Sequence, residues 1–128
     1  MGELYQEMEI NGNITSAKVK AFLDTGSTFN IIRYEFSDGT IAFNIGIEMY
    51  DPEGAEILLP DTDKKTIYGT VTFKSISVFG ITVIDPRFTT FALMNIADDV
   101  IIGHPLMQYL GMVLNFNKDS VNIAGFKT

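Results

Sequence analysis

A carboxylate sits in a tight turn near the start of this sequence. The tetrapeptide Asp24-Thr25-Gly26-Ser27 directly follows the apolar residues 21–23. An Asp side chain at such a turn bonds the backbone two residues on, and Gly permits backbone angles that other residues avoid. A carboxylate delivered there by a strand can act as a general acid or base. The same tetrapeptide also fits a simple turn, so it needs support from elsewhere in the chain.

Other kinds of catalytic chemistry have little material in this sequence. It contains no cysteine, which excludes disulfides and thiolate nucleophiles, and His104 is its one histidine. A Ser-His-Asp triad would need His104, which we interpret instead as a surface residue at a helix start. Asp98-Asp99 lacks the several oxygen ligands of a calcium loop and is interpreted as a solvated turn. We expect no metal and no cofactor, and the available chemistry is that of carboxylates.

The length and composition of the chain predict one globular domain. The 128 residues predict a single domain spanning 1–128, and a hydrophobic content of 46% predicts a packed core. The net charge of −7, with Lys and Arg scattered, argues against nucleic acid as a partner. No apolar run approaches ~18 residues, so no membrane span is expected. The sequence shows no secretory signal, and we expect a cytoplasmic location.

Most of the chain alternates between apolar and polar residues over short stretches, which predicts strands separated by turns. Asn11-Gly12 predicts a type I′ hairpin whose second arm leads into Asp24. Pro105 suits the first position of a helix over 104–110, and Gly111 suits its end. Strands are expected at 4–10, 17–23, 29–32, 40–49, 56–59, 66–73, 76–84, 89–94, 100–102, 112–116 and 121–123.

A second motif supports the first. Residues 100–116 read as an apolar strand stopped by Gly103, a short helix, and Gly111 leading into a final hairpin. This stretch resembles the C-terminal signature of retropepsins, the single-domain aspartic proteases of retroviruses and their cellular relatives. Residues 65–71 are similar to the strand that follows the flap in the protease domain of the ubiquitin-linked DNA-damage-inducible proteins. The resemblance implies an all-β fold, a small closed acid-protease-type barrel with one short C-terminal helix.

The resemblance also implies a function. The family hydrolyses peptide bonds with a water held between two carboxylates, and this chain has one Asp-Thr-Gly. The second Asp24 therefore has to come from an identical subunit, which implies a homodimeric aspartic endopeptidase with a polypeptide substrate. Thr25 would bond across the dimer axis and Gly26 would allow close backbone approach. Ser27 would donate to the Asp24 carboxylate, and Thr28 would line the cleft.

Further parts of the chain take roles by the same resemblance. Residues 57–69 would form a flap with its tip at 60–65, while 51–54 is a rival tip on turn chemistry. An extra hairpin is expected within 40–56, and segments 4–10 and 121–126 would form an intersubunit sheet. The predicted substrate contacts are Ser27, Thr28, Ile67, Tyr68, Gly69 and Ile102. Packing at the flap edge is an equal reading for Tyr68.

Two other functions stay open. The expected flap tip has no glycine, and Thr28 and His104 stand where retroviral enzymes often carry a paired Asp and Arg. These departures favour a catalytically weak or inactive module that binds peptides or dimerises. A third reading is a β-barrel ligand binder in which Asp24 merely shapes a turn.

Overall fold

The first hairpin leads directly to the Asp24 turn. In the computed structural model, which describes residues 4–58 and 64–116, strand β1 (Tyr5–Asn11) pairs antiparallel with β2 (Ser16–Leu23). Gly12 is not among the residues with positive φ, so the predicted type I′ turn is wrong. The connection is a longer loop in which the Gly12 amide donates to the Thr15 carbonyl at 2.8 Å. A Cβ on Gly12 would lie 1.8 Å from the Ile45 oxygen, so close approach is what requires this glycine.

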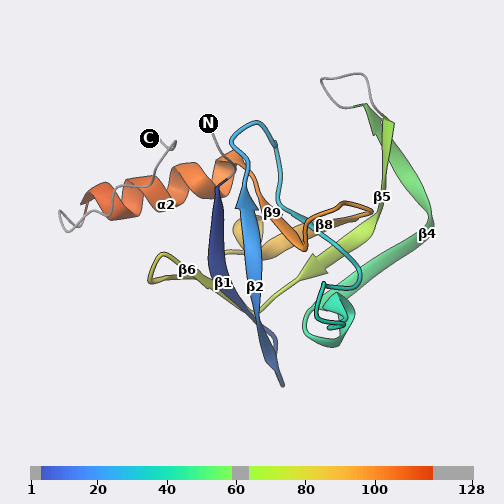
Figure 1. Cartoon of the computed structure of the whole chain (residues 1–128), viewed down its shortest axis with the longest axis horizontal. Helices are drawn as coiled ribbons and strands as arrows, with labels where there is room; N and C mark the ends of the chain where they lie inside the picture. The colour runs from blue at the N-terminus through green and yellow to red at the C-terminus, as the bar shows by residue number, and fades with distance from the viewer. Residues whose placement is uncertain (1–3, 59–63, 117–128) are drawn as a thin grey trace.

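The described strands form one nine-stranded sheet in the order β4-β5-β8-β3-β9-β2-β1-β6-β7 (Figure 1). Its order has two ends, β4 and β7, so the expected all-β character is confirmed but the expected closed barrel is wrong. The remaining strands are β3 (Ile31–Ile32), β4 (Ile47–Leu58), β5 (Lys64–Thr72), β6 (Ser75–Val78), β7 (Ile81–Val83), β8 (Thr90–Met94) and β9 (Val100–Ile102).

Strand β1 is an interior strand of this sheet. Its residues Met8 to Asn11 pair with β6 on the side opposite β2, in the register Met8↔Val78. The predicted intersubunit role of 4–10 is therefore wrong for this half of the strand, because its backbone groups are already bonded within the chain. The other predicted partner, 121–126, lies outside the described residues.

The β4–β5 hairpin is longer and simpler than expected. Residues 40–49 hold the 3₁₀ turn η1 (Ala42–Asn44) before β4 begins, so the extra hairpin within 40–56 is wrong. Residues 51–54 lie inside β4, where the register shifts between Tyr50 and Ala55, and not at a tip. Pro52 and Gly54 are tolerated there because edge strands accept both residues at irregularities. The expected flap tip falls mostly on 59–63, outside the described residues.

The predicted strand 76–84 is in fact two short strands, β6 and β7, joined by a tight turn. Phe79 and Gly80, the two residues between β6 and β7, have φ of 54° and 74°. Two successive positive φ angles are those of a type I′ turn, which matches the twist of a hairpin. The sequence hid this turn because Phe79 is an apolar residue, seldom found in the left-handed region.

Both helices differ from expectation. Helix α1 (Pro86–Thr89) was not predicted; the Asp85 carboxylate caps it by accepting from the Arg87 amide at 2.9 Å. Helix α2 (His104–Phe116) continues through Gly111, so the predicted strand 112–116 is wrong. A glycine inside a helix costs only about 1 kcal/mol, and the apolar residues after it can extend the helix. The predicted strand 121–123 lies outside the described residues.

The core is one cluster of buried residues that draws on strands from both ends of the sheet order. In Figure 1, β1 and β2 stand in the middle of the molecule, with β5 and β8 to their right. Phe73 and Phe91 meet in this cluster edge to face with their ring centroids 5.5 Å apart. Leu106, Met107 and Leu110 of α2 are buried in the same cluster. Helix α2 and the β4–β5 hairpin extend to opposite sides of this core (Figure 1).

Candidate active site

Three short strands fix the position of the Asp24 turn. Strand β9 lies between β2 and β3, parallel to β2 and antiparallel to β3. The loop 24–30 that joins β2 to β3 therefore spans the end of β9. Ile32 and Ile102, from two of these strands, have exposed fractions of 0%, so the base of the loop is anchored in the core.

Backbone hydrogen bonds tie this loop to the residues that follow β9. The Asp24 amide donates to the Ile102 carbonyl at 3.0 Å, and the His104 amide donates to the Ser27 carbonyl at 2.8 Å. A Cβ on Gly103 would lie 2.7 Å from the Phe29 oxygen and 2.9 Å from the Ser27 oxygen. Only glycine allows this approach, which explains why an apolar strand stops at Gly103.

The Asp24 carboxylate is partly exposed at the mouth of the turn. Its Oδ1 accepts from the Gly26 amide at 3.0 Å, and the Asp24 carbonyl accepts from the Ser27 amide at 3.1 Å. Within residues 4–58 and 64–116, no donor reaches Oδ2. Thr25 and Gly26 are exposed. The turn therefore presents a carboxylate oxygen and a short polar backbone outward.

Ser27 behaves differently from the prediction. Its hydroxyl donates to the Phe29 carbonyl at 2.7 Å, so the expected bond to the Asp24 carboxylate is wrong. Ser hydroxyls commonly bond nearby backbone groups inside turns, and here that bond shapes the loop. Thr28 is exposed on the same loop, and its role in lining a cleft stays a prediction.

Asn30 is a site residue that the sequence reasoning missed. Its side chain is nearly buried, with an exposed fraction of 5%. The Nδ2 amide donates to the Phe88 carbonyl at 2.9 Å, and Oδ1 accepts from the Gly103 amide at 2.9 Å. The available signal was a polar residue between Phe29 and Ile31, in a stretch otherwise expected to be a buried strand.

The residues predicted to contact substrate divide into two groups. Tyr68 is partly exposed and lines a groove. Its two neighbours lie in the sheet, where Ile67 pairs with Met94 of β8 and Gly69 pairs with Tyr50 of β4. Ile102 is wrong as a side-chain contact because that side chain is fully buried; its carbonyl instead bonds the Asp24 amide. Asp24 is not among the described residues that line the Tyr68 groove.

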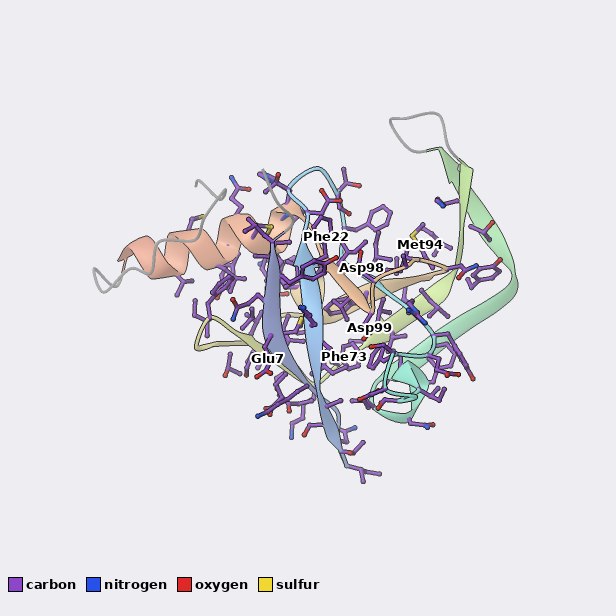
Figure 2. The ribbon with its side chains drawn as sticks, in the orientation of Figure 1. Glu7, Phe22, Phe73, Met94, Asp98 and Asp99 are labelled. Carbon is purple, nitrogen blue, oxygen red and sulfur yellow. The ribbon has the colours of Figure 1, made fainter. Side chains whose placement is uncertain are left out.

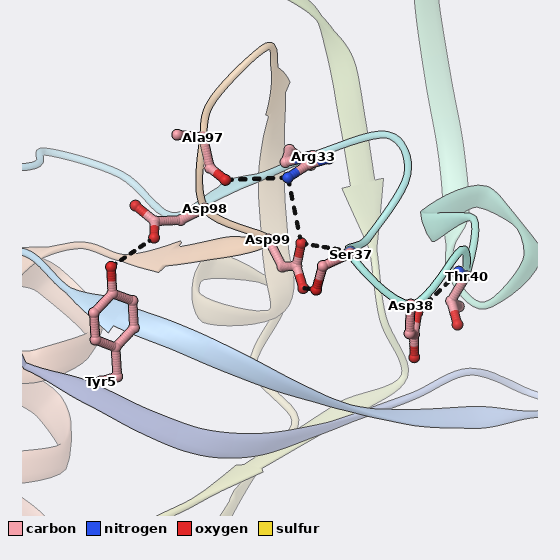
Figure 3. A network of polar contacts seen from close by, with 8 residues as sticks. All are labelled: Tyr5, Arg33, Ser37, Asp38, Thr40, Ala97, Asp98 and Asp99. Carbon is pink, nitrogen blue, oxygen red and sulfur yellow. Dashed lines mark hydrogen bonds and ion pairs between the residues drawn. The ribbon is translucent and has the colours of Figure 1, made fainter.

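The acidic pair Asp98-Asp99 was predicted to be a solvated turn, which holds only in part. Figure 2 shows Asp98 and Asp99 near β2 and Met94 toward the β4–β5 hairpin. Asp98 accepts from the Tyr5 hydroxyl at 2.9 Å (Figure 3). The Asp99 side chain is 13% exposed and accepts two hydrogen bonds from Ser37, so it is a structural carboxylate. Burial next to matching donors explains the difference.

The described residues give no sign of a metal centre or a membrane span. No cluster of three or more metal-ligating side chains occurs in the part of the chain that the structure describes. No helix among those residues is long and apolar enough to cross a bilayer. Comparison with models of known protein families found no match, and a search of curated proteins found no matching relative.

Proposed function

We propose that this protein is a homodimeric aspartic endopeptidase that hydrolyses peptide bonds with a water activated by two Asp24 carboxylates, one per subunit. The observation that carries the proposal is the loop 24–30. It spans β9 and presents the Asp24 carboxylate outward from a buried three-strand base. The retropepsin resemblance of the two motifs supports the same reading.

The chemistry explains why a second copy is needed. One carboxylate has to accept a proton from water while the other donates a proton to the carbonyl oxygen of the peptide. Two close carboxyl groups hold different protonation states because both cannot ionise together. The sequence has one Asp-Thr-Gly, so a two-fold axis beside the turn supplies the other. The exposed Thr25 and Gly26 are the residues that would meet across that axis.

The substrate in this proposal is an extended polypeptide. By the resemblance, the β4–β5 hairpin would cover this polypeptide, and Tyr68 on the returning arm is a candidate contact. We also propose a cytoplasmic location, and neither nucleic acid nor a membrane as a partner. The scattered basic residues and the net charge of −7 support the absence of a nucleic-acid partner.

Two separate Asp→Asn substitutions, one in the candidate site and one outside it, test the proposal. Light scattering should show a dimer, and the purified protein should cleave a peptide library at acidic pH. Asp24→Asn should abolish cleavage because the amide cannot take the proton. Asp38→Asn is the matched control: Asp38 also accepts from a backbone amide two residues on, that of Thr40, at 2.9 Å. A purified dimer that cleaves no peptide between pH 3 and 7 contradicts the proposal.

A second candidate is a peptide-binding or dimerisation module without useful catalysis. The groove lined by Tyr68, with a volume of about 770 Å³, favours it because that groove could hold a peptide without Asp24. This module would bind peptides equally well as wild type and as Asp24→Asn, and neither form would cleave them.

A further inference from the structure

A groove opens beside β5 of the β4–β5 hairpin, and the Asp24 turn contributes none of its described lining residues. Its volume is about 770 Å³, within the usual range for ligand sites. Its walls come from the segment after β3, η1, β5 and the end of β8. This is the groove lined by Tyr68 that was described above, and we call it the Arg33 groove from here on. Its described lining residues are Arg33, Tyr34, Glu35, Phe43, Tyr68, Leu93, Met94 and Asn95.

Aromatic side chains give the Arg33 groove an apolar surface. Tyr34 and Phe43 meet edge to face with ring centroids 5.3 Å apart, which fixes both rings on one wall. Tyr68 lies on another wall, and Leu93 and Met94 are nearly buried, with exposed fractions of 3% each. Such a surface suits a large aromatic or aliphatic side chain.

The Arg33 side chain is held at the groove by the neighbouring loop (Figure 3). Its backbone amide donates to the Asp99 carbonyl at 2.9 Å, and one terminal nitrogen, Nη1, donates to the Ala97 carbonyl at 3.0 Å. The same Nη1 lies 3.6 Å from the Asp99 Oδ1. These contacts orient the guanidinium before any ligand arrives, which lowers the entropic cost of binding.

Within the described residues, Asp99 contacts only the Nη1 atom of the Arg33 guanidinium and leaves its other nitrogens unpaired. Its Oδ1 accepts from the Ser37 amide at 2.8 Å and its Oδ2 accepts from the Ser37 hydroxyl at 2.7 Å (Figure 3). Within residues 4–58 and 64–116, no acceptor reaches Nε or Nη2 of Arg33. The Arg33 side chain is 33% exposed. A guanidinium with two neighbouring N–H groups to spare matches a carboxylate in bidentate geometry.

We propose that the Arg33 groove binds an extended peptide segment that carries one carboxylate next to a large aromatic or aliphatic side chain. Arg33 binds the carboxylate, and the Tyr34, Phe43 and Tyr68 rings enclose the apolar neighbour. Glu35 lies on the same surface and repels a second acid, so the groove favours one acidic residue over an acidic run. That this peptide is a substrate rests on the proposed endopeptidase function; that it binds does not.

Binding to a protein that cannot cleave tests the proposal directly. The probes are fluorescein-labelled, C-terminally amidated hexapeptides of alanine with one Phe, carrying Glu or Gln on either side of it. Fluorescence anisotropy with full-length Asp24→Asn protein should show the better Glu peptide binding about tenfold or more tightly than its Gln counterpart. Added salt should reduce that ratio. A third set, with Gln and a free C-terminal carboxylate, separates a side-chain acid from a chain end.

Substitutions assign the preference to Arg33. Arg33→Gln should bring the Glu-to-Gln ratio close to one, and Arg33→Lys should keep part of it, because Lys keeps the charge without the planar fork. Arg87→Gln is the matched control, since Arg87 pairs with Asp85 outside the groove, and should leave the ratio unchanged. Tyr68→Ala should weaken both peptides alike. It tests the same groove if Arg33→Gln fails to fold.

The outcomes separate this proposal from the proposed function. Equal binding of Glu and Gln peptides, or a preference that survives Arg33→Gln, overturns the Arg33 groove as a carboxylate site. A preference found only for the free C-terminus overturns the side-chain form of the proposal. Arg33-dependent binding without any cleavage by the wild type overturns the endopeptidase alone. Cleavage that is indifferent to Glu in peptides that also bind without preference overturns the groove alone.

Discussion

Asn30 makes a prediction about stability that follows from two hydrogen bonds. Replacing Asn30 with Ala removes the donor to the Phe88 carbonyl and the acceptor of the Gly103 amide. The space left by the side chain lies in a buried region, where water cannot readily replace both partners. The loop 24–30 would then lose two side-chain hydrogen bonds, one to Gly103 directly after β9 and one to Phe88 in α1.

The magnitude can be worked from what is left unpaired. An unsatisfied buried polar group costs about 1–3 kcal/mol. The Gly103 amide is buried and takes a full cost, while the Phe88 carbonyl is only partly buried and takes a smaller one. We expect a loss of about 3 kcal/mol in the free energy of unfolding. With an unfolding entropy of roughly 0.27 kcal/mol/K for this chain length, the midpoint of thermal unfolding should fall by about 11 °C.

Urea unfolding followed by circular dichroism measures this loss, and amide hydrogen exchange at Gly103 locates it. The matched control is Asn11→Ala: Asn11 donates one hydrogen bond, to the Ser75 hydroxyl at 3.1 Å, from a partly buried position. It should cost about 0.5–1.5 kcal/mol. An Asn30→Ala protein that loses less than the Asn11→Ala protein, with Gly103 still protected from exchange, would refute this reasoning.

Substitutions at three further positions have expected outcomes in the same unfolding assay. Gly12→Ala should destabilise by about 1–3 kcal/mol or more, because the new Cβ would meet the Ile45 oxygen at 1.8 Å; unchanged stability would contradict this. Gly80→Ala should cost about 1–2 kcal/mol through its φ of +74° alone, whereas Gly80→Asn should cost less. Hydrogen bonds from Arg87 lower the pKa of the Asp85 carboxyl in the folded state. Asp85 therefore stabilises the folded state above the ordinary carboxyl pKa, and this stabilisation is lost as the pH falls through the lowered value. Asp85→Asn should destabilise the protein at pH 7, and its effect should shrink as the pH falls below the ordinary carboxyl pKa.

The sequence could predict the parts of the fold that local patterns determine. Alternating residues gave the β1–β2 hairpin, and the Asp24 turn follows its second arm as expected. The apolar run before Gly103 is a short strand in which Val100 and Ile102 are buried, as its composition predicts. Each of these features depends on neighbours within a few residues, or on a glycine at a position where the backbone leaves no room for a side chain.

The parts that the sequence could not predict depend on distant contacts. Gly12 looked like a turn glycine, yet the Ile45 backbone is what requires it. Ser27 looked like a donor to Asp24, yet the Phe29 carbonyl takes its hydroxyl. Asp99 looked solvated, yet Ser37 meets it from 62 positions away. In each case the competing partner is set by tertiary packing, which a reading of one local segment cannot supply.

The position of β9 between β2 and β3 has a consequence for how the protein folds during its synthesis. The segment that completes the base of the turn lies about 75 residues further along the chain than the turn itself. A ribosome-bound nascent chain can form the first hairpin early, but it cannot lock residue 24 in place until Val100–Ile102 has been synthesised and has left the exit tunnel. Such non-local closure is slow, so any activity that depends on this turn has to wait until β9 has paired with β2 and β3.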